Sequence, residues 1–267
     1  MTDRLTDAAA LAACIPDGAS LALAPDYSGC AMAVVRELVR RGARGLRLLG
    51  VPQLGLQGDI LIGAGCVAEV EAAAVGLGEH GFAPCFQRAA LSGEIRVRDS
   101  TCPAIHAALT AAERGVPFMP LPGVLGSDLI AARPDWRVIA DPFAGGPILV
   151  VPAQRPDVAL FHAERADRHG NVAIGVRREL MTMAHAAQAS LVSVEEIVAG
   201  SLLDGAAAAG TIPALYVEAV AEIPRGAWPI GCGERYPADQ ACLAAYAEAA
   251  ATAAGFRSFV ERWLAGP

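Results

Sequence analysis

The sequence has 267 residues, of which 54% are hydrophobic and only 5% aromatic, and it carries a net charge of −7. A chain of this length can bury a large core, and small aliphatic side chains suit helices packed on a parallel sheet. The acidic balance lacks the basic surface that nucleic-acid binding requires, so we expect no nucleic-acid partner. All 21 basic residues are arginine, which excludes mechanisms that need a Schiff-base or P-loop lysine from this chain.

Seven cysteines are scattered along the sequence without a C-x-x-C pair. This pattern is typical of reduced thiols in a cytoplasmic protein, and the spacing does not favour a zinc site or another metal centre. Residues 1–4 lead into an alanine-rich stretch with acidic residues, which is unlike a signal peptide. No apolar run reaches the roughly 20 residues that a membrane span needs. We therefore expect a cytoplasmic protein with no membrane partner and no permanently bound cofactor.

Apolar runs bounded by glycine, proline and polar residues alternate with segments of helical period. The predicted helices cover residues 5–14, 31–41, 85–91, 103–114, 179–187 and 238–264, the last interrupted near Gly255. The predicted strands cover residues 20–24, 46–50, 67–75, 94–98, 116–121, 148–151, 158–161, 172–174, 189–194 and 215–222. This alternation predicts an α/β fold with a mostly parallel sheet flanked by helices. No linker or internal repeat is visible, so we predict that residues 1–267 form a single domain.

Residues 156–175 contain the most informative change of pattern in the chain. The apolar run at residues 158–161 predicts a buried strand, and the polar residues 164–169 predict a loop. Gly170 and Asn171 suit a tight turn with positive φ, and a second apolar run predicts a short strand. We interpret Asn171 as shaping the turn rather than contacting substrate. From the residues alone, an ordinary surface connection remains an alternative.

Two polar loops carry residue types that bind or activate substrates. Ser28 and Gly29 lie between a predicted strand and a predicted helix, where backbone N–H groups can hold an anion. Glu79 and His80 lie between two glycines and form a candidate acid–base pair on a flexible backbone. The alternatives are a plain connection for the first loop and a solvated surface pair for the second.

A third loop, residues 123–128, contains glycines that permit close approach of the backbone to a ligand. Gly126 and Ser127 are the candidate binding residues there. Residues 133–146 follow and are rich in proline, tryptophan, aspartate and glycine. We interpret them as an excursion that forms either an active-site edge or a subunit contact.

Several short motifs occur in a particular order: I-P-D-G at residues 15–18, E-R-G-V-P-F at 113–118, G-V-L-G-S at 123–127 and A-D-R-H-G-N-V at 166–172. Together with residues 63–67, 93–95, 195–198 and 218–229, they resemble the alpha-type subunits of family I CoA-transferases, such as the A subunit of glutaconate CoA-transferase. The resemblance extends over nearly the whole chain. At residues 24–29, however, this chain has A-P-D-Y-S-G where such subunits usually carry a G-G-F-G type loop.

The resemblance implies a CoA-transferase/isomerase-like fold and a coenzyme A thioester, an acyl-CoA, as substrate. It implies that CoA moves from a donor thioester to a carboxylate acceptor. A separate beta-type subunit, in a heterodimer or heterotetramer, would supply the nucleophilic glutamate. This chain would supply groups that bind the acyl group and stabilise the developing oxyanion. Its candidates are Glu79 as a catalytic residue and Ser28, Gly29, His80, Gly126 and Ser127 as substrate-binding residues.

Two other functions remain open. The chain also resembles hydrolases that cleave a carbon–carbon bond of a CoA ester in ring degradation. Such relatives can carry a catalytic acid near residues 100–103, where this chain offers only Asp99, which we interpret as a helix cap. Glu79 acting as a base would favour this hypothesis. The third hypothesis is a metabolite sensor without turnover, which usually has a DNA-binding segment that we do not find in this acidic sequence.

Overall fold

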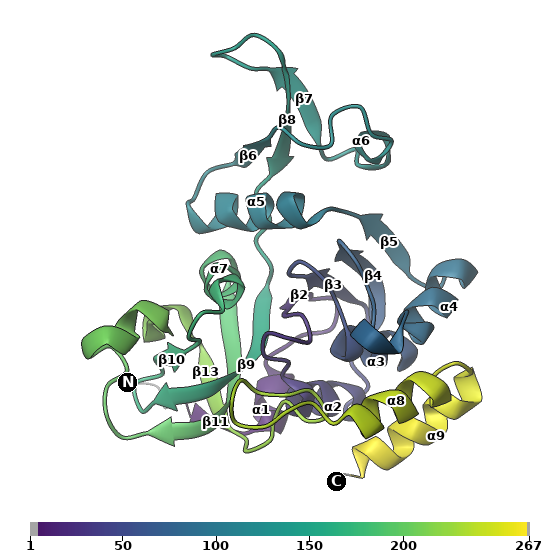
Figure 1. Cartoon of the computed structure of the whole chain (residues 1–267), viewed down its shortest axis with the longest axis vertical. Coiled ribbons are helices and arrows are strands. Elements are labelled where there is room, and N and C mark those ends of the chain that lie inside the picture. Colours follow the sequence, from purple (N-terminus) through teal and green to yellow (C-terminus); the bar gives the residue numbers. More distant parts are fainter. Residues whose placement is uncertain (1–4, 266–267) are drawn as a thin grey trace.

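A parallel sheet forms the centre of the molecule in the computed structural model, which describes residues 5–265 (Figure 1). Its main path runs through β1 (Leu5–Thr6), β13 (Ala219–Glu222), β11 (Ala189–Val198), β9 (Val158–Asp167), β2 (Ser20–Leu23), β3 (Leu46–Gly50), β4 (Val67–Ala72) and β5 (Arg96–Asp99). All neighbouring strands on this path are parallel. The short strands β10 (Val172–Ala173) and β12 (Thr211–Ile212) are antiparallel additions beside β9. The mostly parallel sheet expected from the sequence is confirmed.

Helices cover both faces of this sheet. One face carries α1 (Ala8–Ala13), α2 (Met32–Arg40), α3 (Leu56–Gly63), α4 (Pro84–Ser92), α8 (Gln240–Ala249) and α9 (Ala253–Leu264), and the other carries α5 (Cys102–Glu113) and α7 (Arg178–Ala186). Successive side chains of β9 pack alternately in the two cores, because side chains of a strand alternate between the faces of the sheet. Leu160 packs in the first core and Phe161 in the second. Burial on both faces explains why this strand reads as a continuous apolar run.

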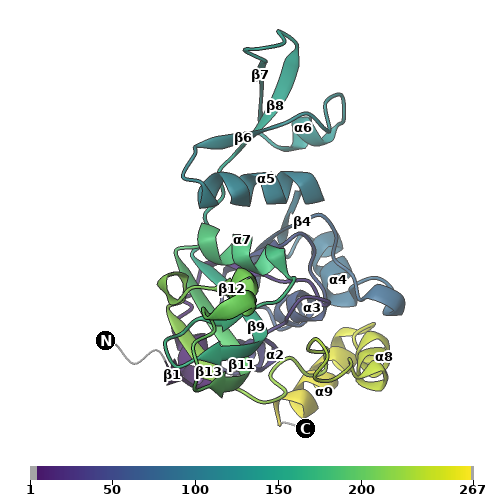
Figure 2. The ribbon, with the colours of Figure 1, turned by 60° about the vertical axis from the view of Figure 1, so that its left-hand side comes forward.

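A small antiparallel sheet stands apart from the main sheet, beyond α5 (Figures 1 and 2). It consists of β6 (Phe118–Leu121), β8 (Pro147–Pro152) and β7 (Arg137–Ala140), with α6 (Leu129–Ala132) beside it. Trp136 and Leu149 pack against Ala104 and Ala108 of α5. The excursion predicted over residues 133–146 comprises β7 and the turns on either side of it. Residues 1–4, on which the signal-peptide expectation depends, and the end of the predicted domain at 266–267 lie outside the described residues.

The predicted loop over residues 164–169 is wrong for residues 164–167, because β9 continues to Asp167. Its extension pairs with β11 on one side and with β10 on the other, so the backbone groups of these polar residues are hydrogen-bonded. Asn171 shapes the following turn as expected. Its amide Nδ2 donates to Asp167 (2.7 Å), and its Oδ1 accepts from the backbone N–H of Ala214 (2.8 Å).

Other predicted boundaries are also wrong. Residues 214–216 form a 3₁₀ turn (η3), so the strand predicted from residue 215 begins only at Ala219. The C-terminal helix breaks after Ala249 rather than near Gly255, and Thr252 caps the second half by accepting from the Gly255 N–H (3.0 Å). Thr101 caps α5, whereas Asp99 ends β5. In each case a local hydrogen bond or strand pairing sets the boundary, and periodicity does not reveal it.

Candidate active site

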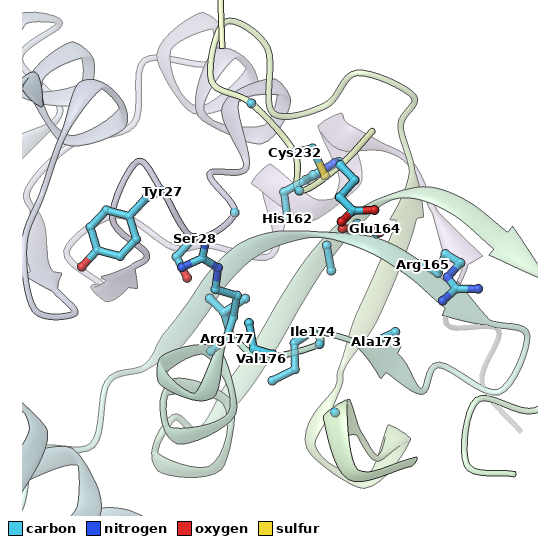
Figure 3. A pocket seen from close by; sticks show the side chains of 18 residues that line it. Tyr27, Ser28, His162, Glu164, Arg165, Ala173, Ile174, Val176, Arg177 and Cys232 are labelled. Atoms are coloured by element: carbon cyan, nitrogen blue, oxygen red, sulfur yellow. The ribbon is translucent and has the colours of Figure 1, made fainter. Parts of the chain in front are cut away.

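A cavity of about 610 Å³, called the main cavity here, opens beyond the paired ends of β2 and β9 (Figure 3). The strand order changes direction between these two strands: β3, β4 and β5 follow β2 on one side, whereas β11 and β13 follow β9 on the other. Such a switch point is where open α/β sheets bind ligands. The walls come from the loop after β2, the second half of β9, the segment from β10 into α7, and residues 231–234.

Close contact between Gly29 and β9 fixes one wall of the main cavity. The Gly29 carbonyl accepts from the His162 N–H at 2.8 Å. Gly29 has a φ of +104°, and a Cβ atom there would lie 2.2 Å from the His162 carbonyl oxygen. Because this distance is far below a van der Waals contact and the φ disfavours other residues, the position requires glycine.

The same loop is tied to the first turn of α7. Ser28 is 3% exposed, and its Oγ donates a hydrogen bond to Oε1 of Glu179. The Arg177 guanidinium lies 5.7 Å from the centre of the Tyr27 ring, which is within the range of a cation–π contact. Tyr27, Ser28 and Arg177 are all labelled among the lining residues in Figure 3. The two contacts join the loop after β2 to the start of α7.

Next to His162 of the cavity wall, the largely buried carboxylate of Glu195 accepts hydrogen bonds from three segments of the chain. Oε1 of Glu195 accepts from His162 Nε2 (2.7 Å) and the Tyr236 hydroxyl (2.6 Å), and Oε2 accepts from the Arg225 N–H (2.8 Å). Burial alone would raise the pKa of Glu195, but the bonds from His162 and Tyr236 outweigh it and lower the pKa to about 2. His162 Nδ1 also bonds to the Ser193 hydroxyl at 2.8 Å. Glu195 is therefore an ionised anchor for this wall.

Cys232 lies next to this cluster and lines the main cavity. Burial, and then the nearby Glu195 and Glu164 carboxylates, raise the pKa of its thiol to about 12, so it is protonated near neutral pH. Ligand atoms of His162, Glu195 and Cys232 lie within 4.8 Å of one another, a spacing that a metal ion can bridge. His162 Nε2 is hydrogen-bonded to Glu195, and burial keeps the Cys232 thiol protonated, so neither residue presents a free ligand atom for a metal ion.

Charged side chains of both signs line the main cavity, with Glu164 and Glu234 as its carboxylates and Arg165 and Arg177 as its guanidinium groups. In Figure 3, Glu164 lies beside Cys232, whereas Arg165 extends away from it. Glu164 lies so close to Gly233 that a Cβ atom there would be 1.9 Å from its Oε1. The loop of residues 231–234 thus confines one carboxylate inside the cavity.

The structure brings together two of the six residues predicted for the site. Ser28 and Gly29 line the main cavity, whereas the other four do not. Glu79 and His80 lie on a 3₁₀ turn (η1, Gly78–His80), where His80 Nε2 bonds to Gln240 of α8 at 2.9 Å. Gly126 and Ser127 lie in the loop between β6 and α6, and the Ser127 hydroxyl donates to the Val124 carbonyl at 2.8 Å. Roles for these four stay predictions.

Sequence reasoning did not identify His162, Glu164, Glu179 or Cys232 as parts of the site. His162 could have been found, because it is a polar residue within an apolar strand and a buried polar group needs partners. Glu179 carried no such signal and was interpreted only as part of a helix. Its contact with Ser28 joins residues 151 positions apart, and only the tertiary structure creates it.

Comparison with known proteins identifies the family. The model of the coenzyme A transferase family matches residues 5–222. The chain belongs to this family. The resemblance to family I CoA-transferases inferred from the motifs is therefore confirmed.

Among relatives, the A subunit of 3-oxoadipate CoA-transferase from Pseudomonas knackmussii is 29% identical, over 100% of this chain and 95% of that one. The IpdA subunit of a cholesterol ring-cleaving hydrolase from Rhodococcus jostii is 33% identical, over 88% and 82%.

An uncharacterized protein from Archaeoglobus fulgidus is 32% identical over 88% of this chain. The chain spans only 53% of the length of that relative. Two solved structures have a TM-score of 0.88. One is a variant of the decarboxylase AibA/AibB, 34% identical over 98% of both chains. The other is glutaconate coenzyme A-transferase from Acidaminococcus fermentans, 25% identical over 98% of this chain and 88% of that one. The expected CoA-transferase-like α/β fold is confirmed by this match.

Proposed function

We propose that this chain is the alpha-type subunit of a heteromeric acyl-CoA transferase, which moves CoA from a donor thioester to a carboxylate acceptor. The observation that carries the proposal is the main cavity, placed at the switch point of the sheet in a member of the coenzyme A transferase family. Relatives named as A subunits of CoA-transferases support it over 100% and 87% of the chain. A coenzyme A thioester would be the substrate, and we propose no permanently bound cofactor.

In this proposal the loop after β2 binds the reacting acyl group. The Gly29 N–H has no hydrogen-bond partner among the described residues, so it is available to an oxygen that becomes negative in the transition state. Loop residues 28–31 lead directly into α2, whose N-terminus favours negative charge. Ser28 and Gly29 are thus the binding residues best supported by the structure.

The nucleophilic glutamate would belong to a beta-type partner subunit, in a heterodimer or heterotetramer. Apolar side chains at the rim of the main cavity support an approaching partner: Val176 is 87% exposed and Tyr27 is 54% exposed. A partner covering this rim would exclude water from the thioester, which strengthens every electrostatic contact inside.

Seven free cysteines fit the reducing cytoplasm, where we place the enzyme. No helix in residues 5–265 has the length and apolarity for crossing a bilayer.

Cleavage of a carbon–carbon bond in a CoA ester is the second candidate function. The decarboxylase AibA/AibB and the ring-cleaving hydrolase subunit are at least as similar in sequence as the named transferases. Such chemistry needs an acid or base next to the substrate, and Glu164 lies inside the main cavity. Near Cys102, where a catalytic acid was considered, the chain offers Asp99, which ends β5.

Co-expression with a beta-type subunit from the adjacent reading frame tests the proposal. We expect a heteromer in size-exclusion chromatography with mass detection. Incubation with acyl-CoA followed by hydroxylamine should trap a modified glutamate on the partner. A heteromer that releases free CoA or carbon dioxide without a trapped glutamate would support the second candidate instead. A chain that remains alone and only binds a metabolite would contradict both enzyme functions and support the sensor hypothesis.

A further inference from the structure

Ser28 and Glu179 form a hydrogen-bonded pair. The proposed transferase function gives Glu179 no role. Ser28 Oγ, on the loop after β2, donates to Oε1 of Glu179 in the first turn of α7. Ser28 is almost fully buried, yet it lines the main cavity. A hydroxyl has one proton, and here that proton points at a carboxylate. This is the arrangement in which a base can activate a serine as a nucleophile.

The surroundings of Ser28 supply the other parts of an acyl-transfer site. The order of β2, loop and α2 is strand, turn and helix, which in other folds presents a nucleophilic serine at the edge of a sheet. In such turns the N–H of the residue after the nucleophile stabilises the oxyanion, and the Gly29 N–H has no partner among the described residues. Because Ser28 gives its own proton to Glu179, its hydroxyl cannot at the same time donate to that oxyanion.

We propose that Ser28 and Glu179 are a nucleophile and its base, and that this chain can accept an acyl group from a thioester onto Ser28. The inference rests on the proposed function, because that function brings an acyl-CoA into the main cavity. It adds an activity of the chain itself, a slow thioester hydrolysis that needs no glutamate from a partner.

Each step balances with water as the only further reactant. Ser28 Oγ bonds to the thioester carbonyl carbon while its proton passes to Glu179. The carbon–sulfur bond then breaks, and the CoA thiolate leaves with the proton from Glu179. Water next attacks the acyl-serine and gives a proton to Glu179, which returns it to Ser28 Oγ as the carboxylic acid leaves.

The test uses a fluorophosphonate probe, which forms a stable bond to an activated serine as fluoride leaves, and needs no knowledge of the acyl group. The intact purified chain is labelled, and peptide mass spectrometry maps the modified residue. We expect label on Ser28 and none there in S28A. E179Q should lower the labelling rate by about 100-fold, the lower end of what a general base contributes.

The E179Q variant distinguishes a Glu179 that acts as a base from one that only stabilises the structure. A glutamine oxygen can still accept the Ser28 hydrogen bond, so a merely structural role would leave the labelling rate and the melting temperature unchanged. The matched control is E113Q. Glu113 of α5 also bonds to α7, through His185 Nδ1 at 3.0 Å, at the opposite end of that helix from Glu179. We expect E113Q to be labelled at the wild-type rate.

Two results would overturn the inference: absence of label on Ser28 in the wild-type chain, or an E179Q rate equal to that of E113Q. The outcome is independent of the trapping experiment. If Ser28 is labelled but no heteromer transfers CoA, the proposed function fails and the nucleophile pair stands. If the partner glutamate is trapped but Ser28 is inert, the proposed function stands and this inference fails.

Discussion

The charge on Glu195 should stabilise the folded chain. The free energy of this effect can be calculated from the lowered pKa, and a substitution can remove the charge. The pKa of Glu195 is lowered from 4.5 to about 2, and its side chain is only 8% exposed. A difference of about 2.5 pKa units corresponds to about 3 kcal/mol, as an upper estimate. Because the folded-state pKa is the lower one, this stability is complete above about pH 4.5. It is lost as the pH falls toward about 2.

The variant E195Q should therefore be less stable than the wild type by about 2–3 kcal/mol at neutral pH. At about pH 3.5 the difference should shrink by about 1.4 kcal/mol, because part of the wild-type advantage has then been lost. Urea unfolding followed by circular dichroism measures both values. The matched control is E196Q, since Glu196 is half exposed in an ion pair with Arg235 and should contribute less than about 1 kcal/mol. A difference between wild type and E195Q that stays constant from pH 7 to 3.5 would refute the reasoning.

Three further predictions concern other parts of the chain. G29A should lower the melting temperature by about 2–8 °C through its left-handed φ alone, and by more because the new Cβ would meet the His162 carbonyl at 2.2 Å; an unchanged scan would contradict the contact. R133M should destabilise the chain by about 1–3 kcal/mol in urea unfolding, because the buried Glu71 loses its closest cation and keeps Arg98 at 3.6 Å and Gln154 at 3.1 Å; it should also speed protease cleavage in the small sheet, and equal cleavage rates would count against this. Burial raises the pKa of Asp26 to about 6, so its effect on wild-type stability should be a fall as the pH rises from about 4 to about 6 and no change above that, whereas D26N should show no such fall.

Much of the fold follows from local sequence pattern. The alternation of apolar runs and helix-period segments predicted the parallel sheet and its two helical layers, because strands buried on both faces must be continuously apolar. The pattern was wrong where backbone pairing overrides side-chain polarity. Residues 164–167 are polar, yet they extend β9 because β10 and β11 provide hydrogen bonds on both sides.

The candidate site could be predicted only in part. The loop of Ser28 and Gly29 was identifiable because a polar, glycine-bearing turn between a strand and a helix has a known capacity to bind anions. Glu79 and His80 had equally suitable chemistry but lie against α8, away from the main cavity. Residue type alone does not distinguish these two loops. They differ in position, because the first follows β2 at the switch point of the sheet and the second follows β4.

The sequence by itself determined the α/β class, the family resemblance and the glycine-dependent loop after β2, because each depends on the local order of residues. Only the tertiary structure decided which distant groups meet in the main cavity. Glu179 reaches Ser28, and His162 reaches Glu195, through parallel strand crossovers that join segments tens to more than a hundred residues apart. Contacts of this kind depend on strand order and register, which are fixed by packing of the whole sheet and leave no mark in local periodicity.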